Sequence, residues 1–142
     1  QIRKAVNLSR EMGFYIMGSF ILGAPFETRR HFESTVKFAN SLPLDLVAFF
    51  TLEYEAGSQL WEEAVKRGKI EPGEHLVFSD SRRGLSEFTK EELEAYCEIA
   101  HKRFYLRPKY WADQVFQAVR RRSFRLFQVV MNVSGETAHK KV

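Results

Sequence analysis

The segment FYIMGSFILGAPFET, residues 14–28, decides the fold of this chain. Residues 14–22 are apolar on both alternating faces, a pattern typical of a strand that is covered on both sides. Gly23, Pro25 and Glu27 end this run just before a charged segment with helical spacing. Parallel α/β folds are built from such strand-to-helix units, and their ligands bind beyond the carboxyl ends of the strands. The segment therefore predicts a ligand-binding loop.

Helices are expected on both sides of this strand. The helix before it has an apolar face made of Ile2, Ala5, Val6 and Met12. The helix after it begins at the capping residue Thr28 and ends before Pro43. A second apolar run, residues 46–52, follows this helix. Strand, helix and strand in this order form a βαβ unit, so we expect the two strands to be parallel.

Capping residues divide the rest of the chain. Ser58 is placed to begin a helix that Gly68 ends. Thr89 and Glu92 form a capping box that opens a further helix, and Pro108 stops or restarts it. Between these helices lies a long stretch rich in turn residues, which predicts an irregular connection.

Two parallel strands are too few for a stable domain, because their edges and faces need neighbours. We therefore predict an α/β fold made of the last two βα units of a partial parallel (β/α) barrel, followed by a C-terminal helical extension. The predicted division is barrel over 1–70, connecting loop over 71–88, helical extension over 89–131 and frayed tail over 132–142; periodicity leaves residues 124–131 open between helix and strand. The expected partner is a missing N-terminal part of the same protein, with self-association through open sheet edges when the chain is isolated.

Composition narrows the class of protein. One cysteine, Cys97, can form neither an internal disulfide nor a cluster-binding set, which favours the cytoplasm. No apolar run reaches the roughly 20 residues of a membrane span. Residues 1–100 hold 12 Lys and Arg against 16 Asp and Glu, whereas residues 101–142 hold 10 against 2. The first 100 residues therefore carry a net negative charge, and the net positive charge of the chain comes from residues 101–142.

Three segments together resemble the radical S-adenosylmethionine enzymes. FILGAPFET resembles the fifth-strand motif of that family, and FFTLEYEAGSQLWEEAVKRGKI resembles its sixth strand and following helix. HKRFYLRPKY resembles a segment after the barrel in the cobalamin-associated branch, which includes the anaerobic magnesium-protoporphyrin ester oxidative cyclases. The resemblance spans residues 1–112 in order and spacing.

The resemblance implies a parent enzyme that binds S-adenosylmethionine and a 4Fe-4S cluster, with cobalamin in an upstream domain as an option. Its reaction would be radical hydrogen abstraction, of oxidative cyclase or methyltransferase type. The family uses the ends of these two strands to hold the adenosyl group by apolar contacts and backbone hydrogen bonds. The implied cofactor-binding positions are Ile21, Gly23, Pro25, Thr51 and Tyr54. Glu27 and Thr28 are expected to cap the helix instead.

The chain also departs from the family pattern. Ser19 replaces the first glycine of the strand motif, and Phe26 replaces a common glycine. The usual prolines of the turn after the second strand are replaced by Leu52, Glu55 and Ala56. The three-cysteine CxxxCxxC cluster motif is absent, and Cys97 is expected to be a small core residue. We therefore predict no catalytic and no metal-binding residue here, and no activity of this chain alone.

The alternative function is a nucleic-acid-binding appendage. Basic and aromatic side chains alternate near the end of the chain, at Arg103, Phe104, Tyr105, Arg107, Lys109, Tyr110, Trp111, Arg120, Arg121, Arg122, Phe124, Arg125 and Phe127. Such a mixture can bind RNA through phosphate contacts and stacking. We favour the simpler interpretation that the basic residues lie on solvated helix faces and the aromatic residues pack on the barrel. Glu53 and Glu55 could act as an acid–base pair but are expected to be solvated, and the four histidines have no metal-binding spacing.

Overall fold

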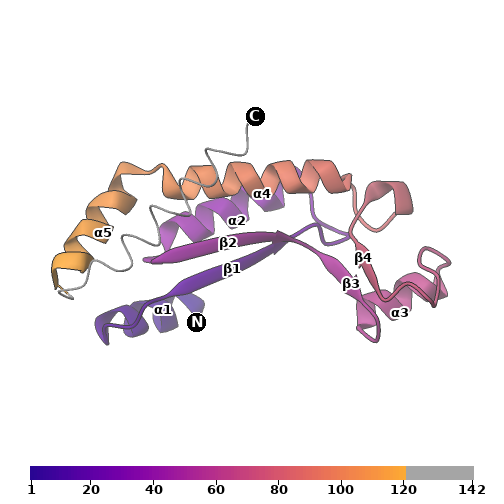
Figure 1. The fold of residues 1–142 in the computed structure, drawn as a ribbon, viewed down its shortest axis with the longest axis horizontal. Coiled ribbons are helices and arrows are strands. Elements are labelled where there is room, and N and C mark those ends of the chain that lie inside the picture. Colours follow the sequence, from indigo (N-terminus) through magenta and orange to yellow (C-terminus); the bar gives the residue numbers. More distant parts are fainter. Residues whose placement is uncertain (121–142) are drawn as a thin grey trace.

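The computed structural model describes residues 1–120, so the predictions for residues 121–142 lie outside the described part. Its elements are α1 (Ile2–Glu11), β1 (Met17–Leu22), α2 (Arg29–Ser41), β2 (Leu46–Thr51), β3 (Glu53–Glu55), α3 (Gln59–Lys66), β4 (Leu76–Phe78), a 3-10 turn (Ser81–Arg83), α4 (Lys90–Tyr105) and α5 (Pro108–Arg120) (Figure 1). The predicted helices and both predicted strands are present. No helix among residues 1–120 is long and apolar enough to cross a membrane.

The predicted βαβ unit is confirmed. β1 and β2 pair in parallel from Met17 opposite Leu46 to Leu22 opposite Thr51, and α2 connects them. α2 and α4 supply the main core that packs on one face of this sheet, whose fully buried members include Phe32, Leu93 and Phe104. The fold is mixed α/β, and the described residues form no closed barrel.

The opposite face of the sheet is exposed, which differs from the expected burial on both sides. Met17 and Ile21 on β1 are each 59% exposed, and Phe50 on β2 is 53% exposed. Side chains alternate along a strand, so these residues share the face away from the core. The difference arises because no described element lies over this face, whereas the apolar sequence is suited to one that does.

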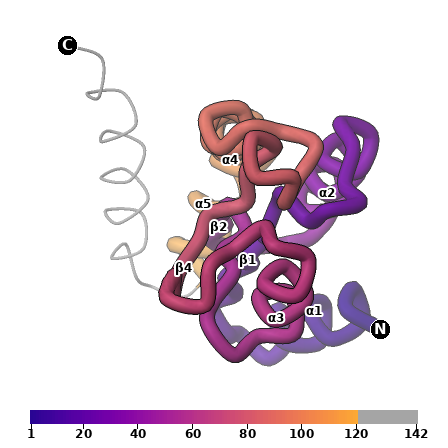
Figure 2. The backbone as a smooth tube through the Cα atoms, turned by 90° about the vertical axis from the view of Figure 1, so that its right-hand side faces the viewer, coloured from indigo at the N-terminus to yellow at the C-terminus, as the bar shows by residue number. Residues whose placement is uncertain are grey.

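The segment 71–88, expected to be an irregular connection, contains a strand and a 3-10 turn. β4 pairs antiparallel with β3, with Tyr54 opposite Val77. Their side chains and α3 form a second small core with Leu85 and Ile70. This module stands at the carboxyl end of β1 and β2, in the foreground of Figure 2. The sequence did not predict β4, because a strand of three residues between turn residues is too short to show an alternating pattern.

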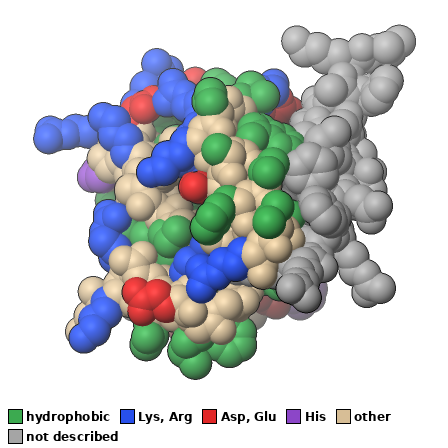
Figure 3. Space-filling model, turned by 90° about the vertical axis from the view of Figure 1, so that its left-hand side faces the viewer, with side chains coloured by type: hydrophobic (Ala, Val, Ile, Leu, Met, Phe, Trp, Pro, Cys, Tyr) green, Lys and Arg blue, Asp and Glu red, His purple; other side chains and the backbone are tan. Residues whose placement is uncertain are grey.

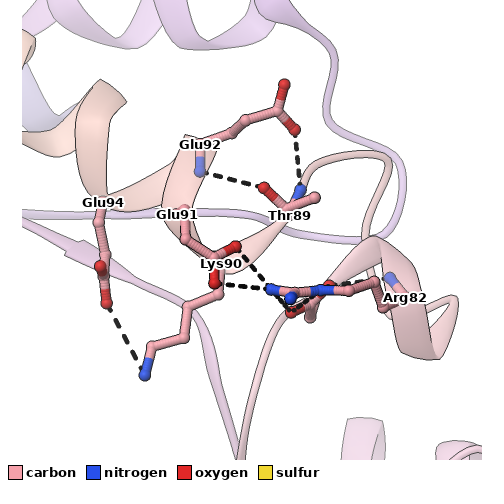
Figure 4. Close-up of polar contacts among 7 residues, drawn as sticks. Arg82, Thr89, Lys90, Glu91, Glu92 and Glu94 are labelled. Atoms are coloured by element: carbon pink, nitrogen blue, oxygen red, sulfur yellow. Dashed lines mark hydrogen bonds and ion pairs between the residues drawn. The ribbon is translucent and has the colours of Figure 1, made fainter.

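The predicted helix caps are present. Ser58 Oγ accepts from the Trp61 N–H, and Thr89 and Glu92 form the expected capping box. Arg82 lies between Asp80 and Glu91 just before α4 (Figure 4). Its hydrogen bonds lower the pKa of both carboxyl groups, so this ion-pair network stays charged at neutral pH.

The outer edge of β2 is covered by side chains from α4 and α5 instead of by a strand. Tyr105 Oη accepts from the Val47 N–H at 3.0 Å and donates to the Val47 carbonyl oxygen at 2.9 Å. His101 Nε2 accepts from the Phe49 N–H at 3.1 Å. Tyr110 Oη donates to the carbonyl oxygen of Asp45 at 2.8 Å, just before the strand. These bonds satisfy the polar groups that an edge strand otherwise leaves unpaired.

Asp45 joins the start of both strands to α1. Its side chain is 1% exposed, and Oδ1 lies 2.6 Å from Arg10 Nη1. Oδ2 accepts from the Ile16 N–H at 2.9 Å, while the Asp45 N–H donates to the Ile16 carbonyl oxygen. A buried carboxylate needs such compensation, because its desolvation is costly.

Figure 3 views the molecule from the end where α5 and the last turn of α1 lie, and hydrophobic side chains gather on this surface. Met12 at the end of α1 is 65% exposed, and Phe116 on α5 is 64% exposed. Large exposed apolar patches are often sites of interaction with other molecules.

We expect Tyr105→Phe to lower the free energy of unfolding of the 142-residue chain by about 2 kcal/mol, because a buried N–H and carbonyl of Val47 lose their partner. Urea unfolding followed by circular dichroism measures this. Tyr96→Phe is the matched control, because the Tyr96 hydroxyl has no hydrogen bond to a described residue, and the contacts of its ring with Phe32, Phe88 and Arg29 are kept by phenylalanine. Equal losses in the two variants would contradict the role assigned to Tyr105.

We also expect stability to fall in mild acid through His101. Its Nε2 accepts from Phe49, so Nδ1 must carry the proton that is donated to the Cys97 carbonyl oxygen at 2.8 Å. Burial lowers the pKa of His101, so the unfolded chain binds this proton more readily. The contribution is complete above the unfolded pKa of about 6.5 and is lost as the pH falls from there toward the folded pKa.

Unfolding free energies measured across this range should show the decline in the parent chain and a smaller slope in His101→Gln. An unchanged slope in the variant would contradict this assignment.

Candidate functional site

The candidate site lies where β1 and β2 end. Leu22 and Thr51 are paired at this end, and the Leu52 N–H donates to the Leu22 carbonyl oxygen at 2.7 Å. β1 then leaves through residues 23–28 into α2, whereas β2 continues into the β3–β4 hairpin. The two exits therefore start side by side, as the sequence predicts.

Gly23 is the tightest point of the β1 exit. It has a φ of +105°, and a Cβ there would lie 2.8 Å from Leu93 Cδ1 and 3.4 Å from Ser79 Cβ. Glu27 Oε2 accepts from the N–H groups of Gly23 and Ala24 at 2.7 and 2.9 Å. Ser79 Oγ donates to the Gly23 carbonyl oxygen. Both backbone polar groups of Gly23 are thus bound within the chain.

Glu27 therefore does something other than cap α2. Thr28 is the N-cap residue, as predicted, and its N–H donates to His31 Nδ1 at 3.1 Å. The Glu27 side chain instead turns back toward its own loop, where its carboxylate accepts hydrogen bonds from two backbone N–H groups. The expectation that Glu27 caps the helix is wrong, because the nearer donors of Gly23 and Ala24 take its carboxylate.

The predicted cofactor-binding residues do not form one cluster. Ile21 lies on the open face of the sheet, opposite Phe50 in the register. Thr51 is opposite the fully buried Leu22, so the alternation places its side chain toward the helices. Pro25 and Tyr54 line a separate small hollow with Ala64, Arg67, Lys69 and Leu85.

Tyr54 is only 2% exposed, and its hydroxyl donates to the Leu85 carbonyl oxygen at 2.9 Å. Burial raises the pKa of this hydroxyl, which keeps it protonated as a donor. Lys69 Nζ donates to the Gly84 carbonyl oxygen across the same hollow. The polar groups here hold the second core together, so the cofactor roles of Tyr54 and Gly23 stay predictions.

Two residues important to the site were missed in the sequence. Phe50 pairs with Ile21 on the open face, and only the alternation with the buried Phe49 could have separated the two phenylalanines. Ser79 is fully buried, and its N–H donates to the Leu52 carbonyl oxygen while its Oγ binds Gly23. It lies in a run of turn residues, so no local signal pointed to it.

Ionisable side chains at the site show no catalytic or metal-binding arrangement. Glu53 and Glu55 are both exposed, as expected. Residues 1–120 contain no group of three His, Cys, Asp or Glu side chains that could hold a metal ion. Cys97 is buried, and burial raises the pKa of its thiol to about 11, which disfavours the thiolate that a metal needs. The predicted core role of Cys97 is confirmed.

Most of the aromatic and basic residues that could bind nucleic acid are buried or form contacts within the chain. Phe104, Tyr105 and Tyr110 are buried, so they cannot stack on bases. Arg103 pairs with Glu33 at 2.7 Å, and Arg107 donates to the carbonyl oxygens of Phe104 and Asn40. The remaining basic run at 121–125 lies outside the described residues. The described helices therefore favour packing over nucleic-acid binding.

Comparison with known proteins gives one informative similarity. The chain is 33% identical over 115 residues to a protein named uncharacterized methyltransferase PH0819 from Pyrococcus horikoshii. The aligned region covers 80% of this chain but 25% of that protein, so the chain spans about a quarter of the relative's length. No protein-family model matches the chain, and no solved structure matches it.

We expect Gly23→Ala to destabilise the chain by about 3 kcal/mol or more, because strain at positive φ adds to a clash with Leu93. Gly57→Ala is the matched control, since Gly57 has a φ of +84° and no atom lies within 4 Å of the position that a Cβ would take there. That variant should lose only about 1–2 kcal/mol. Thermal and urea unfolding measure both, and equal losses would show that Leu93 does not constrain Gly23.

Proposed function

We propose that this chain is part of a longer S-adenosylmethionine-dependent enzyme of methyltransferase type, in which it forms one wall of the cofactor and substrate site. We further propose that β1 and β2 are strands of a partial parallel (β/α) barrel and that the enzyme uses radical chemistry. The relative's name supports the methyltransferase part, and the sequence motifs support the radical part.

The observation that carries the proposal is the open apolar face at the carboxyl end of the sheet. Ile21 and Phe50 lie opposite each other there, and both are more than half exposed. An aromatic ring beside a branched aliphatic side chain offers a purine ring a stacking surface, and base–aromatic stacking is worth about 1–3 kcal/mol per base. In a barrel the face away from the helices is the interior, where a water-excluded site forms.

The loop after β1 supports this surface instead of binding the ligand through Gly23. Glu27 and Ser79 hold the two backbone polar groups of Gly23, which fixes the point at which the chain leaves the strand. The β3–β4 module is tied to the same point by Ser79. The wall is therefore preorganised before any ligand arrives.

The described residues do not fit an iron–sulfur cluster. Their single cysteine is buried with a raised pKa, and they hold no metal-binding group. When bound to the longer protein, cluster and S-adenosylmethionine would supply the hydrogen-abstracting radical. We therefore propose neither a cluster site nor a cobalamin site within residues 1–120, and we place both groups in the part of the protein that this chain lacks.

The test uses the longer protein, expressed with the coding sequence upstream of Gln1, purified without oxygen and supplied with iron and sulfide. We expect it to bind S-adenosylmethionine and to form 5′-deoxyadenosine when dithionite is added. Ile21→Asp should weaken S-adenosylmethionine binding at least about tenfold, because a carboxylate replaces an apolar contact with the purine ring. Equilibrium dialysis with labelled S-adenosylmethionine measures the affinity.

Leu106→Asp is the matched control, because Leu106 is 75% exposed at the far end of α4. It should bind S-adenosylmethionine as the unchanged protein does. Formation of S-adenosylhomocysteine without 5′-deoxyadenosine would overturn the radical part of the proposal and keep the methyltransferase part. Absence of binding would overturn both.

A further inference from the structure

α5 has apolar side chains on two of its faces. Tyr110 and Ala118 are buried on the face that packs on the rest of the chain. The other face is also apolar, and its residues recur at helical spacing: Ala112, Val115, Phe116 and Val119. We call these four residues the α5 outer face, and the last three are 50%, 64% and 62% exposed. A helix that packs by one side is expected to be polar on the other, so the α5 outer face is suited to a further apolar contact.

Cationic side chains border the α5 outer face. Arg120 lies one turn after Phe116, and Lys109 lies two turns before it, so both cations are on the same side of the helix. Asp113 is the acidic residue of α5, and it lies one turn after Lys109. The sequence adds positive charge after α5, because residues 101–142 hold 10 Lys and Arg against 2 Asp and Glu. The charge around this face therefore favours an anionic partner.

α5 stands at the end of the sheet opposite the candidate site. Tyr110 Oη donates to the carbonyl oxygen of Asp45, which precedes β2, so α5 lies where the strands begin. The β3–β4 module lies at the other end of the molecule, beside the exits of β1 and β2 (Figure 1). On the surface at the α5 end, hydrophobic side chains gather with Lys and Arg side chains beside them (Figure 3). A contact made through α5 therefore leaves the candidate site accessible.

We propose that the α5 outer face binds the surface of an anionic lipid membrane, with its apolar side chains among the acyl chains and with Lys109 and Arg120 at the headgroups. An amphipathic helix of this kind lies in the plane of the membrane interface without crossing it, and anionic lipids strengthen its binding. The membrane lies at the end of the sheet where the strands begin, so the candidate site faces away from it. The inference goes beyond the proposed function and does not rest on it.

Two other occupants fit the α5 outer face less well. In a symmetric pair of α5 helices, the cations of one copy would lie near those of the other, whichever way the helices run, and like charges repel. Nucleic acid needs exposed aromatic rings for stacking, but Phe116 is the one aromatic side chain of this face and the others are aliphatic. A layer of acyl chains accepts aliphatic and aromatic side chains alike.

Sedimentation with lipid vesicles tests the proposal on the longer protein. Vesicles made of equal parts of phosphatidylcholine and phosphatidylglycerol should bind the protein at least about tenfold more tightly than vesicles of phosphatidylcholine alone, because anionic lipids attract the cations beside the face. Added salt should weaken this binding by screening the charges. No S-adenosylmethionine is needed, so failure of the proposed function would leave this result unaffected.

Matched variants identify the surface that binds. Phe116→Glu should weaken binding to the anionic vesicles at least about tenfold, whereas Phe116→Leu should bind as the unchanged protein does, because it keeps an apolar side chain. Lys109→Glu should weaken binding at least about threefold. Lys66→Glu changes the net charge equally but should have little effect, because Lys66 lies on α3 at the other end of the molecule (Figure 1). Phe116, Lys109 and Lys66 are all exposed, so each variant should unfold at the urea concentration of the unchanged protein.

Equal binding of Phe116→Glu and the unchanged protein would overturn the proposal, and so would equal binding to the two kinds of vesicle. Absence of vesicle binding would overturn it as well. If the protein then bound single-stranded RNA or an acidic protein, and Phe116→Glu abolished that binding, this partner would be identified as the occupant in place of the membrane.

Discussion

The hydrogen bonds between α4 and the outer edge of β2 are the constraint on which the rest of the structure depends. Tyr105 occupies the N–H and the carbonyl oxygen of Val47, and His101 occupies the N–H of Phe49, which another strand would otherwise bind. Burial raises the pKa of Tyr105 and lowers that of His101, and both shifts keep the groups in the neutral forms that these bonds require. Because α4 is held at this edge, it covers one face of the sheet, and the opposite face stays open.

Because α4 covers one face of the sheet and the outer edge of β2, a ligand at the carboxyl end of the sheet can reach only the opposite, exposed face. Ile21 and Phe50 present apolar surface there, next to a β1 exit whose geometry is fixed by Gly23, Glu27 and Ser79. The β3–β4 module adds a second core beside this exit and is joined to it through Ser79. A surface of this kind is suited to hold a flat ring, but it needs the remaining strands of a sheet to become an enclosed site.

The sequence predicted the helices, the parallel strand pair and most helix caps, because these depend on local signals. Apolar periodicity placed α1, α2 and α4, and the capping residues Thr28, Ser58 and Thr89 placed three helix starts within one residue. Contacts between distant segments were not predictable in this way. Ser79 reaches Gly23 across 56 positions, and Tyr105 reaches Val47 across 58, so neither role leaves a pattern in its own neighbourhood.

The sequence also predicted only part of the candidate site, because some of its features depend on contacts between distant segments. The exits of β1 and β2 lie together because parallel pairing requires it, and Ile21 faces the open side. Thr51 and Tyr54 turn elsewhere, since the register and the β3–β4 hairpin, which the sequence did not reveal, decide where they point. The family resemblance predicted cofactor-binding residues from their positions in the motifs. In the structure, the polar groups of Gly23 and Tyr54 instead form hydrogen bonds that hold the β1 exit loop and the second core.

A crystal structure of the longer protein with S-adenosylmethionine bound tests the central claim most directly. The account predicts that the adenine ring lies against Ile21 and Phe50, on the sheet face opposite α2 and α4. A nucleoside bound on the helical side, or an open face filled entirely by other protein, would contradict it.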